Sequence, residues 1–309
     1  MIPEAFSAAG RFWRGNIHTH STLSDGSLPP DEVIRRYKAA GYDFLALTDH
    51  FMARFNWPVA DTIAARDTSF TTLIGAELHA PRTEMSDLWH LVAVGLPLDF
   101  APNAEDETGV SLARRAYEAG AFVGIPHPAW YMLSLAEAET VVPFVHAVEI
   151  YNHGCHMMHD RGDGAYLLDG LADKGHRLLA YACDDAHFHC PDFGGGWIEV
   201  KADENTPEAL LAALKAGAFY STQGPAIHHV EITDDEILVE CSPAKGILVN
   251  GQGYQNTFRY ESGICYARLS KADLQDTPWC RIIVIAEDGK RAWTNPIWGQ
   301  TSYSISRFR

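Results

Sequence analysis

Two histidines stand one residue apart near the start of the chain, in the stretch IHTHSTLSDG, and a carboxylate follows them. In an extended strand, alternation sends His18 and His20 to the same face, where two imidazoles can converge on one cation. A half-exposed strand edge with alternating polar residues is the other interpretation, and Asp25 in Ser-Asp-Gly is by local chemistry first a turn residue. The stretch therefore predicts a metal site only if further ligands exist elsewhere.

Further histidines and carboxylates do occur, and most of them come at or just after the carboxyl ends of predicted strands. Barrel enzymes assemble their sites at that end of the sheet. The residues in this position are His18, His20, His50, Glu77, His127, Asp185 and His187. His90 is the exception because it begins its predicted strand. Taken singly, His90 and His127 would more often be hydrogen-bonded structural histidines, and only the whole set makes them candidate ligands.

Imidazole and carboxylate together suit Zn²⁺, Mn²⁺ or Fe²⁺, and the set exceeds what one ion needs. Glu77 ends an apolar strand, where an unpaired carboxylate is costly and a cation would remove the cost. We therefore expect two or three divalent metal ions that share a bridging carboxylate. Asp49 and Asp184, next to candidate ligands, are predicted to support the site rather than to bind metal.

The elements that position these residues alternate between strands and helices. Residues 15–19 read as a strand, a helix begins at Pro30-Asp31 and ends before Gly41, and the apolar run 42–50 is typical of a parallel sheet. Further strands are expected at 71–78, 90–96, 121–126, 147–152, 177–183 and 196–202, and helices at 111–120 and 206–218. The short spacing between Glu77 and His90 predicts a hairpin-like excursion. This alternation indicates a barrel-like α/β domain.

The pattern changes near residue 225. The remaining segments are short, β-rich and separated by Asp-Asp, Gly-Gln-Gly and Asp-Gly turn signals. We therefore predict two domains, a barrel over residues 1–224 and a small, sandwich-like all-β domain over residues 225–309.

Composition limits the possible partners and the compartment. The formal charge of −16 over 309 residues opposes binding to a nucleic-acid polymer. The six cysteines form no CxxC pair or dense framework, which suits a reducing compartment. No apolar run is long enough to span a membrane, and the first residues do not resemble a secretory signal. We expect a cytoplasmic protein with no membrane attachment, and the sequence leaves oligomerisation open.

The order of the motifs HTH…SDG, LTDH, the Glu77 strand, HLVAVG, IPHP and DDAH resembles the PHP (polymerase and histidinol phosphatase) superfamily of metal hydrolases over about residues 14–224. The segments ENTPEALLAALKAGAFYSTQGP and AWTNPIW also resemble a branch related to carbaryl-hydrolase-type metallohydrolases. The resemblance implies a distorted (β/α)₇ barrel and a di- or trinuclear centre. Where histidinol phosphatases often carry a histidine, this chain has Asp25.

The resemblance also implies how the ligands are shared among the ions. One ion would be held by His18, His20, Asp185 and the bridging Glu77. A second would be held by Asp25, His50 and His187, and a third by Glu77, His90 and His127. Among these residues, Glu77, Asp185 and His187 are the expected catalytic residues.

Three residues outside the ligand set are candidates for substrate binding. Arg54 follows the LTDH motif and could direct its guanidinium at a phosphate or carboxylate, although an ordinary surface arginine is the alternative. His79 lies two residues beyond Glu77 and could line the same mouth or occupy a solvated loop. His153, which follows the strand 147–152, is the best candidate in the run NHGCHMMHD.

The implied reaction is hydrolysis by a metal-activated hydroxide. The leading hypothesis is a phosphoesterase that acts on a small phosphorylated metabolite or nucleotide. The second keeps the metal centre and cleaves a carbamate, ester or amide instead. A non-catalytic metal-binding module is the third hypothesis, which the complete set of ligand positions disfavours.

Overall fold

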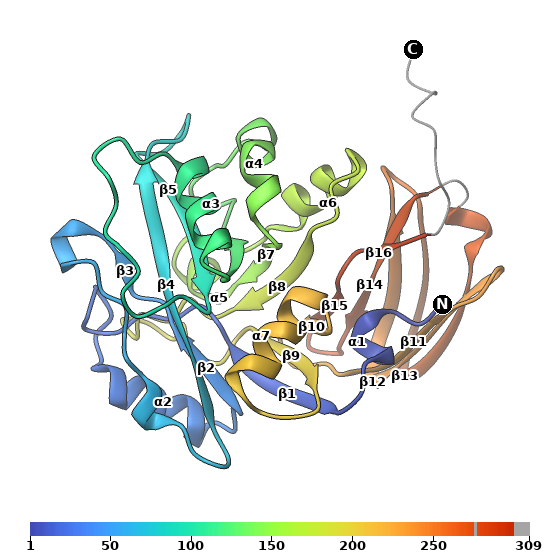
Figure 1. Ribbon diagram of the computed structural model, residues 1–309. Coiled ribbons are helices and arrows are strands. Elements are labelled where there is room, and N and C mark those ends of the chain that lie inside the picture. The colour runs from blue at the N-terminus through green and yellow to red at the C-terminus, as the bar shows by residue number, and fades with distance from the viewer. Residues whose placement is uncertain (275–276, 300–309) are drawn as a thin grey trace.

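The computed structural model describes residues 1–274 and 277–299. Its strands form one hydrogen-bonded sheet that curves into a barrel and then continues into a C-terminal β region (Figure 1). The strand order in the barrel part is β10-β9-β1-β2-β4-β5-β6-β7-β8. The expected fold class, a distorted α/β barrel with a C-terminal all-β region, is confirmed.

The barrel strands are β1 (Arg11–Asn16), β2 (Phe44–Leu47), β3 (His50–Phe51), β4 (Thr71–Pro81), β5 (Leu88–Val94), β6 (Phe122–Ile125), β7 (Ala147–Asn152), β8 (Leu179–Cys183), β9 (Trp197–Ala202) and β10 (Phe219–Thr222). Strands β4 and β5 are antiparallel, which confirms the hairpin expected between Glu77 and His90. Past the ends of β1 and β8, Thr19 and Ala186 form an isolated parallel bridge. This bridge brings the segments after β1 and β8 together, and both segments carry candidate ligands.

The helices are α1 (Glu4–Ser7), α2 (Pro30–Ala39), α3 (Gly109–Glu118), α4 (Leu135–Val141), α5 (His153–His159), α6 (Ala165–Asp173) and α7 (Pro207–Ala216). Short 3-10 turns lie at Ala53–Phe55 (η1), Ile63–Ala65 (η2), Val142–Phe144 (η3) and Lys271–Leu274 (η4). Helix α7 follows its sequence signals, since the Thr206 side chain accepts a hydrogen bond from Ala209 N and Gly217 ends the helix with φ 75°. Among the described residues, no helix is long and apolar enough to cross a membrane.

The first strand differs from the prediction. It spans Arg11–Asn16 rather than residues 15–19, because Arg11 to Gly15 pair with β9 in antiparallel register. The backbone of residues 18–20 instead bonds to neighbouring loops: Asp185 N donates to His18 O at 2.8 Å and His20 N donates to Ala186 O at 2.9 Å. His18 and His20 therefore lie past the end of the strand, where they face the middle of the barrel mouth.

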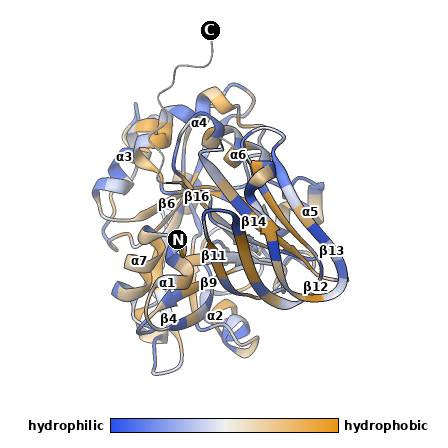
Figure 2. Ribbon diagram, turned by 90° about the vertical axis from the view of Figure 1, so that its right-hand side faces the viewer, coloured by the Kyte–Doolittle hydropathy of each residue, from blue (hydrophilic) through white to orange (hydrophobic). Residues whose placement is uncertain are grey.

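The C-terminal β region comprises β11 (Ile227–Ile232), β12 (Glu236–Gly251), β13 (Asn256–Ser270), β14 (Trp279–Ile285), β15 (Arg291–Thr294) and β16 (Ile297–Trp298). Figure 2 views the molecule with β11 to β14 facing the reader. A separate apolar core that includes Val239, Val249 and Ile282 fills this region. Its expected end, residues 300–309, lies outside the described residues, and the division at residue 225 stays a prediction.

Several contacts tie the C-terminal region to the barrel, among them a strand pairing, the hydrogen bonds of Asn295 and an ion pair between Arg281 and Asp169. Strand β10 pairs with β15 through Tyr220 and Thr294, so the sheet crosses the expected boundary without a break. The buried Asn295 side chain accepts a hydrogen bond from Ala180 N in β8 at 2.7 Å. Its amide group also donates to Gly217 O at 3.0 Å and to Phe219 O at 2.9 Å.

One histidine of the barrel wall predicts a pH-dependent stability. The His146 ring packs between Tyr117 and Phe122, and its Nδ1 accepts a hydrogen bond from Val123 N at 3.1 Å. Burial, and secondly the charge of Lys215, lower the pKa of His146 to about 4. The unfolded chain then binds a proton at higher pH than the folded chain, so this contribution is full above about pH 6.5 and is lost as the pH falls toward 4.

We expect His146→Asn to make the free energy of unfolding less dependent on pH between 4 and 6.5, because the amide oxygen can still accept from Val123 N but does not titrate. Urea denaturation at a series of pH values measures this slope. His176→Asn, at a surface ion pair, is the control. An unchanged slope in His146→Asn would show that another group titrates.

Candidate metal centre

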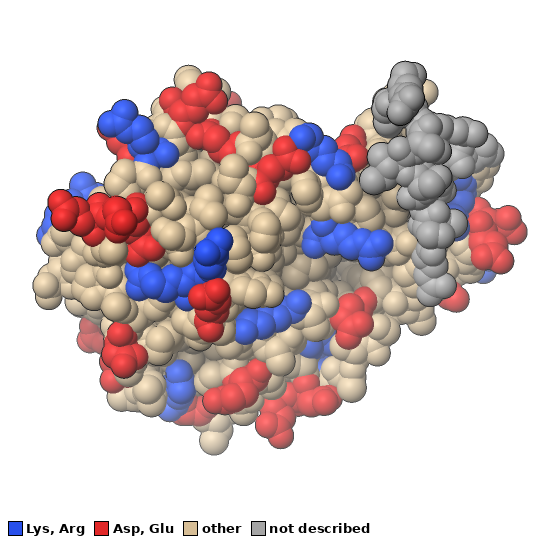
Figure 3. Space-filling model, turned by 45° about the horizontal axis from the view of Figure 1, so that its top comes forward, with Lys and Arg blue, Asp and Glu red and all other residues tan. Residues whose placement is uncertain are grey.

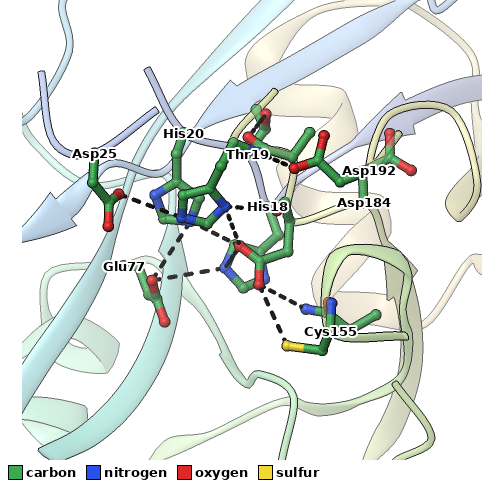
Figure 4. Close-up of polar contacts among 12 residues, drawn as sticks. His18, Thr19, His20, Asp25, Glu77, Cys155, Asp184 and Asp192 are labelled. Carbon is green, nitrogen blue, oxygen red and sulfur yellow. Dashed lines mark hydrogen bonds and ion pairs between the residues drawn. The ribbon is translucent and has the colours of Figure 1, made fainter. Parts of the chain in front are cut away.

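The candidate ligands converge at one end of the barrel, although they come from many separate segments (Figure 4). His18 and His20 follow β1, His50 begins β3, and Asp185 follows β8. Glu77 lies within β4 and is in register with His50 on β3. The side chains of the innermost residues are almost completely buried, with His18, His20 and Glu77 at 0% exposure. The centre is therefore a buried group of imidazoles and carboxylates, which only a cation or protons can neutralise.

His18, His20 and Asp185 form the inner group. Asp185 Oδ1 lies 3.2 Å from His18 Nε2 and 2.9 Å from His20 Nε2. Together, the three residues offer ligand atoms within 4.8 Å of one another. Glu77 Oε2 lies 3.8 Å from His18 Nε2 and 3.6 Å from His20 Nε2, so Glu77 borders this group.

An outer group lies closer to solvent. Asp25 Oδ1 is 3.3 Å from His50 Nε2 and 3.3 Å from His187 Nε2, and His20 completes the group. The Asp25 side chain is 41% exposed, against 13% for His50 and 14% for His187. This group therefore forms the solvent-accessible side of the centre.

Glu77 stands between the groups and contacts a third set of histidines. Its Oε1 lies 2.8 Å from His90 Nδ1 and 3.1 Å from His127 Nε2. His18, Glu77 and His127 form a further set with ligand atoms close together, and His50, Glu77 and His79 form another. A carboxylate with one oxygen near each of two histidine sets has the geometry of a bridging ligand.

Several buried atoms of the candidate ligands have no hydrogen-bond partner. Four of them lie close together: His18 Nε2, His20 Nε2, Glu77 Oε2 and Asp185 Oδ1. The Nδ1 atoms of His20, His79 and His127 also lack a partner. Buried polar atoms are normally hydrogen-bonded, so such a concentration of unpaired lone-pair donors needs an explanation. Divalent cations with mixed nitrogen and oxygen ligands would satisfy them. The residues present therefore fit the metal ions that the sequence implies.

The electrostatics keep the central carboxylates ionised. Burial by itself raises the pKa of Glu77, but the nearby histidines, above all His50 and His79, hold that pKa well below its usual value. Burial likewise opposes the ionised form of Asp185, and the neighbouring His18 and His20 lower its pKa. The pKa of His50 rises to about 10 despite burial, because Glu77 and Asp25 stabilise its charged form. Anionic oxygens thus lie at the centre of the site.

Two side chains of β7, Glu149 and Asn152, contact the candidate ligands and fix their orientation. Glu149 Oε1 lies 3.0 Å from His18 Nδ1, and its other oxygen accepts from His127 N at 2.6 Å. Asn152 Nδ2 donates to Glu149 at 2.9 Å and to Asp185 Oδ2 at 3.1 Å. Such contacts fix which ring nitrogen faces the metal. Neither residue is among those predicted from the sequence, although a carboxylate inside the apolar strand 147–152 is a signal.

The backbone at two ligands is strained. His127 has φ 27° and Asp185 has φ 52°, in the region that non-glycine residues seldom adopt. Residues held in such conformations cluster at functional sites, where the surroundings fix them. Here, the bond from His127 N to Glu149 and the bond from Asp185 N to His18 O do so.

Asp49 and Asp184 have the supporting positions expected for them. Asp49 accepts hydrogen bonds from Ser21 N and Ser21 Oγ, each at 2.8 Å, and from Ser24 Oγ at 2.7 Å. It thereby holds the loop that carries Asp25. Asp184 accepts from the backbone N–H groups of residues 194–196 and from Tyr37 Oη.

Asp49→Ala is expected to weaken binding of the ion at the outer group by roughly 10–100-fold, because the Asp25 loop loses its anchor. Isothermal titration of the metal-free protein with Mn²⁺ measures the affinity. Asp87→Ala, at an exposed position on the β4–β5 loop, serves as control. Equal affinities in both variants would contradict this role of Asp49.

The three residues predicted at the substrate lie in different places. Arg54 is exposed in η1, and its guanidinium packs 4.6 Å from the centre of the Phe55 ring, which stacks on His50. His79 is buried next to Glu77, with 3% exposure. His153 lies at the start of α5, where its Nδ1 is 2.9 Å from Tyr151 Oη, and it is in none of the ligand groups.

Comparisons with known proteins agree with this architecture. The sequence model of the PHP domain matches residues 16–179, a segment that ends before Asp185 and His187. A search of curated proteins gives no match. A two-domain protein from Bacteroides vulgatus, which contains a predicted PHP-like metal-dependent phosphoesterase, has a similar structure with TM-score 0.54 and 14% identity. The likeness covers 94% of this chain and 98% of that one, and at this identity it supports the fold alone.

Two further structures are less similar. One is a candidate metal-dependent phosphoesterase from Bifidobacterium adolescentis, with TM-score 0.41 and 13% identity over 56% of this chain and 87% of that one. The other is an amidohydrolase from Chromobacterium violaceum with bound sulfate, with TM-score 0.39 and 18% identity over the same shares. The resemblance to the carbaryl-hydrolase branch stays a prediction. Because the family match spans more than half of the chain, the chain belongs to the PHP domain family and has the clustered His, Asp and Glu side chains of a metal-dependent hydrolase.

Proposed function

We propose that the protein is a phosphoesterase that hydrolyses a small phosphorylated metabolite or nucleotide with two or three divalent ions of Zn, Mn or Fe. The observation that carries this proposal is the convergence of unpaired His18, His20, Glu77 and Asp185 atoms at one buried point. Packing of the barrel alone gives no reason to bury these groups together. Membership in the PHP family supports the same chemistry.

The family resemblance implies how the ligands would be divided, and the groups of close ligand atoms agree with it in part. His18, His20, Asp185 and Glu77 would hold the inner ion, and Asp25, His50 and His187 would hold the outer ion. Glu77, His90 and His127 would hold a third ion.

Bound divalent ions supply a nucleophile at neutral pH, by lowering the pKa of water, and Lewis acidity that stabilises charge on phosphate oxygens. The protein itself positions the ions and the substrate. Glu77 and Asp185 keep their negative charge in the buried part, which holds the centre together. His187 is oriented by the contact of its Nδ1 with Asp185 O at 2.9 Å, so its Nε2 faces Asp25 and the solvent side. The substrate phosphate therefore arrives beside Asp25 and His187.

Arg54 is the proposed phosphate contact at the edge of the centre, because its loop follows His50 directly and its side chain is exposed there. Arg54→Gln should raise KM roughly 10-fold with little change in kcat, since a charge-assisted hydrogen bond to substrate is lost. Steady-state kinetics measures the change, with Arg259→Gln on β13 as the control. An unchanged KM would place the phosphate contact elsewhere.

The charge distribution agrees with a small substrate. Lysine and arginine groups alternate with aspartate and glutamate groups on the face shown in Figure 3. A continuous basic surface, which a nucleic-acid polymer would need, is not seen on this face. The net charge of −16 also repels any polyanion.

Metal analysis of the purified protein, coupled to a screen of phosphoesters and aryl carbamates, tests the proposal. We expect bound divalent metal and phosphate release that chelation removes and Mn²⁺ or Zn²⁺ restores. Metal-dependent carbamate cleavage without phosphoester cleavage would instead favour the second hydrolase class. A protein that binds no divalent ion would contradict both.

A further inference from the structure

His79 is a buried histidine that the division of ligands leaves without a role. It lies two residues after Glu77 on β4, so both side chains extend from the same face of the strand. Across the hairpin, His79 is in register with His90. With 3% exposure, it has almost no surface that a substrate could contact, so the substrate-binding role expected from the sequence does not suit it.

One contact of the His79 ring is with His50, a candidate ligand of the outer group. His79 Nε2 lies 2.9 Å from His50 Nδ1, with the geometry of a hydrogen bond. His50 Nδ1 is also 2.6 Å from Glu77 Oε2. That second contact is close but lacks hydrogen-bond geometry, since Glu77 Oε2 has no hydrogen-bond partner. Of the two contacts of His50 Nδ1, the one with His79 has hydrogen-bond geometry.

A neutral imidazole has one N–H group and one lone pair. His50 Nε2 faces Asp25, 3.3 Å from its Oδ1, and must present its lone pair there to bind the outer ion. The hydrogen of His50 must then lie on Nδ1, and it needs an acceptor. His79 Nε2 is in position to accept it, which leaves Glu77 Oε2 free to bind an ion. The hydrogen of His79 then lies on its buried Nδ1, which has no hydrogen-bond partner.

We infer that His79 is a positioning residue of the metal centre: its Nε2 accepts a hydrogen bond from His50 Nδ1 and directs the His50 Nε2 lone pair to the outer ion. This inference rests on the proposed function, because it takes His50 as a ligand. It assigns His79 neither to the substrate nor to an ion. The consequence is that the outer ion depends on a residue that does not touch it.

Two substitutions separate this role from direct ligation and from simple packing. His79→Gln keeps an acceptor, because the amide oxygen can reach the position of Nε2, whereas His79→Leu fills similar space without one. His176→Leu, at a half-buried ion pair with Glu139 just after α6, is the matched control. Metal content is measured by mass spectrometry, and affinity by calorimetric titration of the metal-free proteins with Zn²⁺.

We expect His79→Leu to weaken the outer ion roughly 10–100-fold and leave the other ions bound, and His79→Gln to restore most of that affinity. Loss of a full metal equivalent in His79→Gln would overturn the inference in favour of direct ligation. Wild-type affinity in a folded His79→Leu would also overturn it, by showing that the contact is only packing.

A measurement on the unmodified protein keeps the test decisive if His79→Leu does not fold. Long-range ¹H–¹⁵N spectra of the zinc-loaded wild type should show His50 protonated at Nδ1 and bound through Nε2. Binding through Nδ1 would overturn the inference. A wild type that binds no zinc at all contradicts the proposed function rather than the role of His79.

Discussion

Glu77→Gln is expected to lower kcat/KM by at least roughly 10²–10³-fold and to reduce the bound metal by one equivalent or more. Removal of a single group that stabilises transition-state charge commonly costs this much, and Glu77 contacts every ligand group. An amide offers one oxygen instead of two anionic ones, so it cannot bridge the sets around His18 and His127. Kinetics of the purified variant, with metal content by mass spectrometry, measures both effects.

Glu84→Gln is the control for Glu77→Gln because Glu84 is exposed on the loop of the same β4–β5 hairpin. Circular dichroism should show that both variants are folded. If Glu77→Gln kept wild-type metal content and activity, the centre would not be where we place it.

Removal of the metal ions should abolish hydrolysis and lower the melting temperature. Ions that bind only the folded chain stabilise it by RT ln(1 + [L]/Kd), about 4 kcal/mol when the free ion is 1,000 times its Kd. Without them, the buried His18, His20 and Asp185 atoms lose their partners. Dialysis against a chelator, followed by calorimetry and assay before and after addition of Mn²⁺ or Zn²⁺, tests both effects.

The Glu77→Gln variant supplies the control for metal removal, since chelation should shift its melting temperature less than that of the wild type. Full activity in a sample that mass spectrometry shows to be metal-free would contradict the proposed chemistry. A lost activity that no added ion restores would point to irreversible unfolding, which circular dichroism detects.

The sequence was sufficient to predict that the ligands gather, for a physical reason. Parallel strands end at the same edge of a sheet, so residues such as His50 and Asp185, which follow apolar strands, must lie near each other. The hairpin from Glu77 to His90 was predictable because too few residues separate the two strands for a helix. The fold class could be inferred from the same alternation of elements.

The features that the sequence did not predict depend on contacts between distant segments. The start of β1 is set by its pairing with β9, and no local signal in residues 11–16 shows that partner. His79 and His153 looked alike in the sequence, each shortly after a strand residue of interest, yet one is buried against His50 and the other lies beside Tyr151. The direction in which a histidine ring points depends on its tertiary neighbours. The local sequence pattern does not show these neighbours.

The Asn295 side chain makes the C-terminal β region part of the wall of the metal barrel. It accepts from Ala180 N in β8, and β8 leads within a few residues to Asp185. A chain that stopped at residue 224 would leave this N–H group without its acceptor and would expose the edge of β10 that now pairs with β15. The strand that leads to the candidate ligands Asp185 and His187 is thus held in part by a residue more than a hundred positions further along the chain.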